Sequence, residues 1–329
     1  MNKTNTLVSV SIITYNQAEF IAQTLESVIA QITSFDYEIL VADDCSTDGT
    51  QEILKEYQRR YSELIKLYIQ PENVGSTKNS FHNYMAAKGK FIAAVEGDDY
   101  WIDNKKLQKQ VDFLQNNPQF IAIQDKSLVV DESGEEIDIH SIEESKRFWE
   151  FDKNEFLVED FNNWKMPGQN GGLMYRNIFQ REDVDCNVLW QLSRNVGDRT
   201  LIMLLLFCGR IHCSNEYTSV YRYMVNSNNY IASQKSNNLR YEEYKLMDSL
   251  EDYASKMSDR SIDLSKPKKN TIVGATCIWI ADNNAKNKDV LKNIIKYRGN
   301  YIRKLLIVLQ VVIWKVRCRL KGTDERFPI

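Results

Sequence analysis

Apolar and polar residues alternate in short blocks along the first half of the chain, and these blocks predict strands and helices in turn. Four brief, nearly continuous apolar runs are typical of buried strands; they are residues 7–13, 37–42, 65–69 and 91–95. The segments between them carry apolar residues at helical spacing, and we expect helices at 17–31, around 53–57, and at 76–88. Strands and helices that alternate in this way form right-handed βαβ units, which predicts an α/β fold with a mostly parallel sheet flanked by helices.

The same rhythm continues more weakly to about residue 225 and then stops. We expect a helix at 107–114, strands at 120–130, 171–176 and 218–224, and an apolar helix at 200–208. An Asn- and Ser-rich stretch reaches residue 238, and the pattern beyond it is helical. The sequence therefore predicts a domain over 1–225 and a helical C-terminal extension over 226–329.

Charge is distributed unevenly, although the net charge is only −3. Residues 266–321 hold 14 Lys or Arg and two acids, a net charge of +12, and the last eight residues add −1, so residues 1–265 carry −14. An acidic body without a recognition motif argues against nucleic acid as a partner. A basic tail suits an anionic surface instead. The hydrophobic content of 43% is ample for a core and argues against a disordered chain.

The cysteines and the N-terminus indicate a cytoplasmic setting. The six cysteines form no C-x-x-C pair and no zinc-ligand spacing, which fits a reducing compartment. Residues 1–6 are polar and lead into the first predicted strand, so no secretory signal peptide is expected. No stretch reaches the roughly 20 apolar residues that are needed to cross a bilayer.

Three carboxylates follow the strand at 91–95 within four positions: Glu96, Asp98 and Asp99. Carboxylates this close repel one another and raise one another's pKa values unless a cation neutralises them. Their hard oxygen atoms suit Mg²⁺ or Mn²⁺. The pattern therefore predicts a divalent metal site, and its alternative is a solvated acidic turn that caps the next helix.

A second acidic pair, Asp43 and Asp44, ends the second strand, and ionised carboxylates there can accept hydrogen bonds from a ribose or a base. We expect Thr14, Asp43 and Glu96 along one edge of the sheet, because open α/β sheets bind ligands at the carboxyl ends of their strands. The glycine-rich loops G-x-G-x-x-G and G-x-x-x-x-G-K-[ST] are absent. A metal, helped by a cation such as Lys78, would then balance a diphosphate; otherwise Lys78 is a plain surface lysine.

Asp198 is the remaining candidate for chemistry. It follows Gly197 and precedes the apolar helix expected at 200–208, which predicts an acid at a helix N-terminus, a carboxylate at the lip of a cleft, or both. The three histidines lie near no motif and are expected as core or surface residues. With no Ser/His/Asp or Cys/His arrangement visible, no nucleophile is predicted.

The N-terminal half resembles the family 2 glycosyltransferases of GT-A fold, and among them the bacterial enzymes of surface-polysaccharide synthesis. The matching segments are VSIITYNQAEFIAQTLESVIAQ, EILVADDCSTDGT, NVGSTKN and GKFIAAVEGDDYW, in the family's order and spacing across about residues 7–115. A weaker match runs through GDRTLIMLLLFCGRI to SVYRYMV, near residue 224. Four ordered motifs make the resemblance specific.

The resemblance implies roles for the residues that would bind the donor nucleotide. Thr14, Tyr15 and Asn16 would line the nucleotide pocket, with Glu19 close by. In the double-aspartate motif, Asp44 would contact the base and ribose, with Asp43 beside it. Lys78 matches a basic position near the nucleotide.

It also implies a metal site and a catalytic base. Glu96 stands where the family's D-x-D motif has its first aspartate, so it would contact ribose or metal. Asp98 would be the main metal ligand, and Asp99 would support it or face the sugar. Asp198 falls where inverting members hold their base, although Gly197 replaces the glutamate that often precedes it. Trp101 would pack on the sugar ring, or else it is a core tryptophan.

The activity implied is that of an inverting hexosyltransferase with a Mn²⁺ or Mg²⁺ cofactor. It would move a sugar from a nucleotide-diphosphate donor, expected to be a UDP-sugar, to a carbohydrate or lipid-linked acceptor. One alternative is a non-catalytic binding or scaffold protein of the same fold, against which the retained carboxylates argue. The other is a nucleotidyltransferase, which would normally show a glycine-rich phosphate loop.

The basic tail contains an apolar segment, 305–316, with Arg303 and Lys304 before it and Arg317, Arg319 and Lys321 after it. Twelve helical residues at about 1.5 Å each fall short of a hydrocarbon core of about 30 Å. Cationic flanks around an apolar helix suit a helix that lies in the interface of an anionic leaflet. We therefore expect peripheral association at the inner face of the cell membrane; the alternatives are packing on the catalytic domain or a dimer contact.

Overall fold

The computed structural model describes residues 6–138, 151–224, 238–257 and 260–321, together with 323 and 327. The chain divides into two compact units, one of residues 1–161 and 165–224 and one of residues 162–164 and 225–329. The boundary expected between 225 and 226 lies next to this division.

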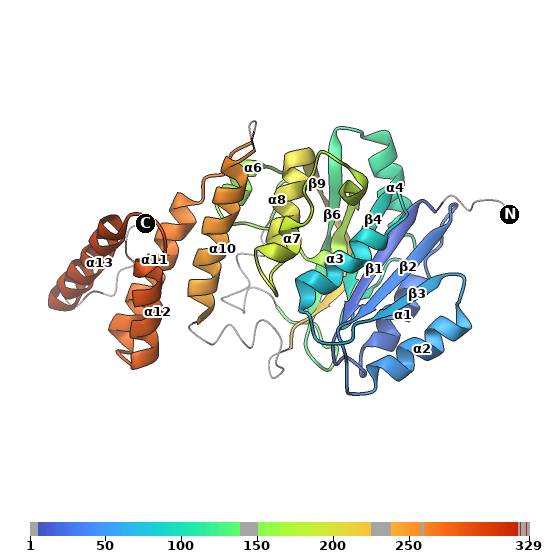
Figure 1. The fold of residues 1–329 in the computed structure, drawn as a ribbon, viewed down its shortest axis with the longest axis horizontal. Coiled ribbons are helices and arrows are strands. Elements are labelled where there is room, and N and C mark those ends of the chain that lie inside the picture. Colours follow the sequence, from blue (N-terminus) through green and yellow to red (C-terminus); the bar gives the residue numbers. More distant parts are fainter. Residues whose placement is uncertain are drawn as a thin grey trace. The chain divides into compact units, whose positions relative to one another are not determined.

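The first unit holds all the strands of the described residues and most of their shorter helices (Figure 1). Its strands are β1 (Val8–Thr14), β2 (Tyr37–Asp43), β3 (Ile65–Ile69), β4 (Phe91–Glu96), β5 (Tyr100–Trp101), β6 (Phe120–Val130), β7 (Glu155–Phe156), β8 (Leu173–Arg176) and β9 (Arg210–Arg222). The α-helices of this region are α1 (Ile21–Ile29), α2 (Thr50–Arg60), α3 (Ser76–Ala86), α4 (Lys106–Asn116), α6 (Val158–Asn162), α7 (Val188–Gln191) and α8 (Asp198–Cys208), and two 3₁₀ turns are η2 (Asn170–Gly172) and η3 (Ile178–Gln180).

One sheet joins the strands in the order β3-β2-β1-β4-β8-β6-β9-β5, with β7 paired to β9. Strands β1 to β4 pair in parallel, as βαβ units require, and β6 pairs in parallel with β9. β8 is antiparallel to both β4 and β6, so it joins the two parallel parts. The predicted α/β fold is confirmed.

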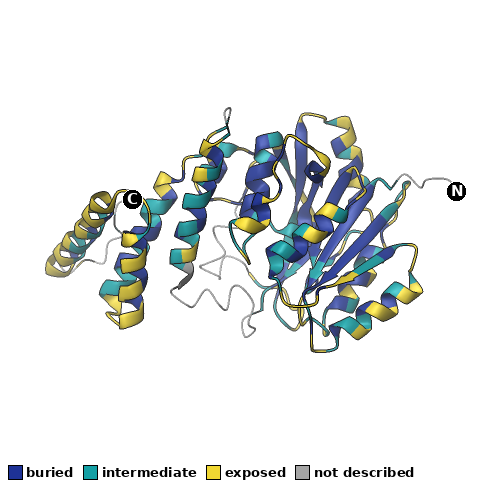
Figure 2. Ribbon diagram, in the orientation of Figure 1, coloured by how far each residue is buried: buried dark blue, intermediate teal, exposed yellow. Residues whose placement is uncertain are grey.

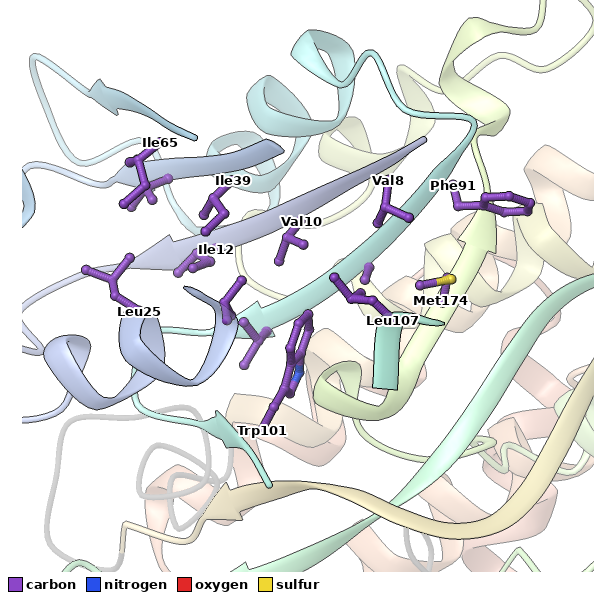
Figure 3. Close-up of a cluster of buried hydrophobic side chains, with 14 of the residues drawn as sticks. Val8, Val10, Ile12, Leu25, Ile39, Ile65, Phe91, Trp101, Leu107 and Met174 are labelled. Atoms are coloured by element: carbon purple, nitrogen blue, oxygen red, sulfur yellow. The ribbon is translucent and has the colours of Figure 1, made fainter. Parts of the chain in front are cut away.

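Alternation along β1 shows why the sheet is covered on both faces. Val8, Val10 and Ile12 are fully buried and pack in a cluster with apolar residues of α1, α2 and α4 (Figure 3). The intervening Ser11 lies on the other face, where the Asn83 side chain of α3 donates to its hydroxyl group at 3.2 Å. Successive side chains of a strand point to opposite faces, so both helix layers are anchored to the same strand.

One strand is longer than its sequence pattern predicts. β9 begins at Arg210 rather than near 218, because its first half pairs with β6 and β7 although it is polar. The polar first half of β9 has no alternating apolar pattern in the sequence, so only its pairing with neighbouring strands identifies it as a strand.

The second unit is helical, as predicted. Its helices are α10 (Asn238–Ser255), α11 (Ser265–Ala281), α12 (Ala285–Lys296) and α13 (Tyr301–Lys321). They surround a core that includes Tyr244, Ile272, Leu291 and Ile294. Within the described residues, no helix has both the length and the apolar character that a membrane crossing needs.

Thr24 connects the helix layer to the turn after β4. Its side chain is fully buried in α1, and its hydroxyl oxygen lies 2.9 Å from the Gly97 carbonyl oxygen and 2.7 Å from that of Asp99. One hydroxyl proton is shared between two buried acceptors, so removing it leaves both without this partner.

We expect Thr24→Val to lower the free energy of unfolding by about 1–3 kcal/mol, because the isosteric side chain keeps the packing and loses the hydrogen bond. Urea unfolding measures the change. Thr47→Val is the matched control, since Thr47 is exposed, and it should change the free energy by less than about 0.5 kcal/mol. Equal effects of the two substitutions would contradict the role given to Thr24.

Candidate functional site

The carboxyl ends of three parallel strands meet at one edge of the sheet. Thr14 of β1 is in register with Asp43 of β2, and Ile13 is in register with Glu96 of β4. The predicted alignment of Thr14, Asp43 and Glu96 is confirmed.

An acidic turn follows β4, and its three carboxylates lie together. One oxygen atom from each of Glu96, Asp98 and Asp99 lies within 4.8 Å of the others. Gly97 lets the turn approach the loop after β1, because a Cβ atom there would lie 2.4 Å from Gln17 Oε1 and 2.8 Å from Thr14 Oγ1. The turn therefore has no space for a side chain at this position.

Burial raises the pKa values of all three carboxyl groups, and neighbouring carboxylates add to this effect for Glu96 and Asp99. Burial and then the charge of Asp98 raise the pKa of Glu96 to about 7, with a smaller contribution from Asp198. Burial raises the pKa of Asp98, and burial together with Asp98 and Glu96 raises that of Asp99 well above its usual value. The ionised forms of these carboxyl groups are therefore disfavoured at this turn.

Arg222, which the sequence analysis missed, partly offsets this charge. Its backbone N–H donates to Asp99 Oδ1 at 2.9 Å, and its side-chain Nε donates to the Asp98 carbonyl oxygen at 3.1 Å. Its guanidinium lies 4.6 Å from the ring centroid of Phe20 and also donates to Gln23 at 2.8 Å. The available signal was a single basic residue inside the aromatic segment SVYRYMV.

Asn170 is a second residue that the sequence analysis missed. It lies in η2, and its side-chain amide donates to Glu96 Oε1 at 3.0 Å, which favours the ionised form of Glu96. The following Gly172 packs so tightly that a Cβ atom would lie 2.2 Å from the Asp125 carbonyl oxygen. The glycines that flank Asn170 were the signal in the sequence.

The acidic pair after β2 organises two loops. Asp44 accepts the backbone N–H groups of Val74 at 2.7 Å and Gly75 at 2.9 Å, one on each carboxylate oxygen. Asp43 accepts the backbone N–H of Ser46 at 2.9 Å. Both acids are buried. Each oxygen of Asp44 keeps a lone pair, so the predicted contact of Asp44 with a base or ribose remains compatible with this geometry.

The loop after β1 is fixed to the loop after β2. Asn16 adopts φ 52°, its N–H donates to Ser46 Oγ at 2.8 Å, and its side-chain carbonyl accepts the N–H of Thr47 at 2.8 Å. Tyr15 remains 48% exposed and Glu19 is also exposed. Both side chains therefore lie at the surface beside the site, and their predicted contact with a nucleotide stays a prediction.

Lys78 lies in the first turn of α3, with its ammonium 5.7 Å from the ring centroid of Trp190. The start of this helix is fastened to the segment before α8. The Thr77 hydroxyl donates to the Ser193 carbonyl oxygen at 2.6 Å, and the Arg194 guanidinium donates to the Asn73 carbonyl oxygen at 2.8 Å. Lys78 is thus held on the same side of the sheet as the segment that leads to Asp198.

Asp198 is the first residue of α8, after Gly197. It is partly exposed, and one carboxylate oxygen accepts the backbone N–H of Arg199 at 2.8 Å. Its charge contributes to the raised pKa values of both Glu96 and Tyr84, so it acts on the same region as the acidic turn. The structure places Asp198 within electrostatic reach of Glu96, although 102 positions separate them in the chain.

Trp101 lies in the hydrophobic core and not in the site. Figure 3 shows it among the buried hydrophobic side chains. It is 4% exposed, and its indole N–H donates to the Gly171 carbonyl oxygen at 3.0 Å. The Lys106 ammonium lies 5.0 Å from its ring centroid. With its faces packed against other residues, the ring is not available to a sugar, and the structure favours the alternative of a core tryptophan.

The model of the glycosyl transferase family 2 matches residues 9–180, more than half of the chain. EpsE of Bacillus subtilis (strain 168), provisionally named a glycosyltransferase, is 35% identical over 39% of this chain and 45% of its own length. TuaG of the same organism, provisionally named a teichuronic acid biosynthesis glycosyltransferase, is 35% identical over 33% of this chain and 42% of its own. The chain thus spans less than half the length of these two curated relatives.

Solved structures show the same fold. The crystal structure of S. aureus TarS residues 1–349 in complex with UDP-GlcNAc has a TM-score of 0.65 at 16% identity, covering 98% of this chain and 94% of that one. The mannosyltransferase PcManGT from Pyrobaculum calidifontis in complex with GDP-Man and Mn²⁺ has a TM-score of 0.52 at 15% identity, covering 94% and 86%. The fold is that of the GT-A glycosyltransferases, and the chain belongs to glycosyl transferase family 2.

Proposed function

We propose that this chain is an inverting, metal-dependent hexosyltransferase that uses a nucleotide-diphosphate sugar, with a UDP-sugar as the first candidate. One observation carries the proposal: the carboxylates of Glu96, Asp98 and Asp99 converge at the carboxyl edge of the sheet, with Asp198 acting on the same region. Family membership makes sugar transfer the chemistry to test first.

The acidic turn fits a divalent cation. It offers three hard oxygen donors, and burial, together with repulsion at Glu96 and Asp99, raises their pKa values; a dication would favour the ionised forms. Asp98 is the principal ligand in this proposal, because it stands at the second aspartate position of the D-x-D motif; all three carboxylates also accept a hydrogen bond, Glu96 from Asn170, Asp98 from Gln17 and Asp99 from the Arg222 N–H. A bound Mn²⁺ or Mg²⁺ would neutralise charge on the diphosphate.

The remaining steps use the chain's own residues. The edge formed by Thr14, Tyr15, Asn16 and Asp44 would hold the nucleoside, and Lys78 adds positive charge beside it. Asp198 would accept the proton of the acceptor hydroxyl as that oxygen attacks the anomeric carbon from the side opposite the leaving diphosphate, which inverts the configuration. An ordinary carboxylate suffices, because the hydroxyl loses its proton late, while the new C–O bond forms.

TarS is solved with UDP-GlcNAc and PcManGT with GDP-Man, and this supports a nucleotide-sugar donor without fixing the base. The name of TuaG, which refers to teichuronic acid biosynthesis, supports surface-polysaccharide synthesis. The acceptor in this proposal is a carbohydrate or a lipid-linked molecule. All six cysteines are free, which supports action in the cytoplasm.

Calorimetric titration of UDP with and without Mn²⁺ tests the nucleotide site. We expect Mn²⁺-dependent binding that Asp98→Asn weakens at least tenfold, because the principal ligand is lost. Asp198→Asn should leave UDP affinity within about twofold and reduce sugar transfer by about 10²–10⁴-fold, the range of general base catalysis.

Glu182→Gln removes an exposed carboxylate and is the matched control for both variants. Unchanged transfer by Asp198→Asn would remove Asp198 from the role of base. Metal-dependent UDP binding without turnover of any UDP-sugar would favour the non-catalytic alternative, and failure to bind UDP would shift the test to GDP and dTDP.

The raised pKa of Glu96 predicts how stability depends on pH without metal. Between its ordinary value of 4.5 and about 7, the folded state holds a proton that the unfolded state has released, so stability falls as pH rises through this range. From pH 5 to 8 we expect Glu96 to cost about 1–2 kcal/mol, which allows for its partial exposure. Urea unfolding in a chelator, compared with Glu96→Gln, measures this.

Mn²⁺ should stabilise the wild-type protein more strongly at pH 8 than at pH 5, because it binds the ionised carboxylates. Glu19→Gln, an exposed carboxylate of the same site edge, should behave like the wild type. Parallel pH profiles of the wild type and Glu96→Gln in the chelator would contradict the raised pKa.

A further inference from the structure

Helix α13 packs on the second unit through one narrow stripe. Lys304, Val311 and Cys318, spaced seven residues apart, are the buried residues of this helix. Ile307 and Val308 beside the stripe pack on the cluster formed by α10, α11 and α12. Residues seven apart lie on one side of a helix, so this stripe sets which side faces inward.

Lys304 fixes that orientation more firmly than apolar packing alone would. Its buried ammonium donates to the carbonyl oxygens of Ile294 at 3.1 Å, Tyr297 at 2.9 Å and Arg298 at 2.7 Å, at the C-terminal end of α12. It also lies 4.7 Å from the ring centroid of Tyr244. A cation at the carbonyl end of a helix satisfies acceptors that have no partner within the helix. Rotating α13 would break these contacts.

The opposite side of α13 is apolar and exposed. Leu309 is 53% exposed and Leu320 is 83% exposed, and Figure 2 shows exposed residues along much of this helix. Six of the exposed apolar residues recur at intervals of four and three, and Tyr301 and Leu305 are exposed as well; the six are Ile302, Leu306, Leu309, Ile313, Val316 and Leu320. At about 100° per residue they form one continuous stripe, about 27 Å long at 1.5 Å per residue. We call it the outer stripe.

Charge decides which partner fits the outer stripe. Helix α13 holds six Lys or Arg and no Asp or Glu. Three of them, Arg303, Arg317 and Lys321, lie about 60–100° from the centre of the outer stripe on one flank, by helical geometry. A second copy of this helix would bring two cationic helices together with no acid in either to pair with them. An anionic lipid surface offers apolar depth for the stripe and negative charge for its flank.

We propose that the outer stripe of α13 inserts into the interface of an anionic leaflet, with the helix lying in the plane of the membrane. The basic flank binds the lipid headgroups, while Lys304 keeps the buried side of the helix, with Val311 and Cys318, on the protein. Only the purpose of this binding rests on the proposed function, since it would bring the catalytic site to a lipid-linked acceptor. The binding itself needs neither metal nor donor.

Sedimentation with phosphatidylcholine vesicles containing about 30% phosphatidylglycerol tests the surface, because anionic lipid adds attraction for each basic residue. The full chain should bind these vesicles and bind pure phosphatidylcholine much more weakly. Leu309→Ser combined with Ile313→Ser should weaken binding at least tenfold. Arg317→Gln and Lys321→Gln should each cost about fivefold on the anionic vesicles and little on the neutral ones.

Gln310→Ser is the matched control, because Gln310 is exposed on the same helix outside the outer stripe and should leave binding unchanged. Each variant is also titrated with UDP and Mn²⁺ and compared by circular dichroism, so loss of the fold or of the nucleotide site is seen separately. Vesicle binding that the Leu309/Ile313 variant retains would overturn the proposal, as would no preference for anionic vesicles. A dimer in light scattering without lipid, abolished by the same variant, would make a second copy the occupant.

Discussion

Repulsion among three carboxylates is the constraint around which the site is built. Glu96, Asp98 and Asp99 would spread apart if the turn after β4 were free, and in this fold it is held from several directions. Thr24 binds its carbonyl groups from α1, Arg222 binds both aspartates from β9, and Asn170 binds Glu96 from η2. The fold therefore imposes the clustering of these carboxylates, and burial together with their mutual repulsion raises the pKa values of Glu96 and Asp99.

The residues that hold the acidic turn in place come from widely separated parts of the chain, so several elements together determine its conformation. β1, β2 and β4 bring their carboxyl ends to one edge, while β9 returns much later in the sequence to bring Arg222 there. The segment before α8 is fastened to the start of α3, which positions Asp198 close enough to affect Glu96. A change in any of these supports would alter the charge of the site without touching the carboxylates.

The uneven charge of the chain has a structural counterpart. The acidic part contains the site, whereas the basic part ends in a helix whose apolar outer stripe faces solvent. Exposing a long apolar stripe costs free energy in water unless something covers it. An anionic bilayer would cover the stripe and balance the adjacent charge at once.

Much of this protein could be predicted from its sequence because the signals are local. Apolar runs and helical spacing indicated the strands up to β4 and their helices, and the acidic turn at Glu96–Asp99 was visible as a cluster of like charges. The convergence of Thr14, Asp43 and Glu96 followed from the parallel topology, since strands of one direction end at one edge.

Other features exist only in the folded molecule. From the sequence, Trp101 could equally have packed on a sugar ring or in the core. Its burial and its contacts with Gly171 and Lys106 show that it is a core residue. Arg222 and Asn170 carry no motif, because their role depends on which backbone they meet across the sheet. The sequence likewise showed an apolar, basic helix at the end of the chain. Which of its sides faces outward was decided by Lys304 binding to the end of α12, a contact between helices that no periodicity along one helix contains.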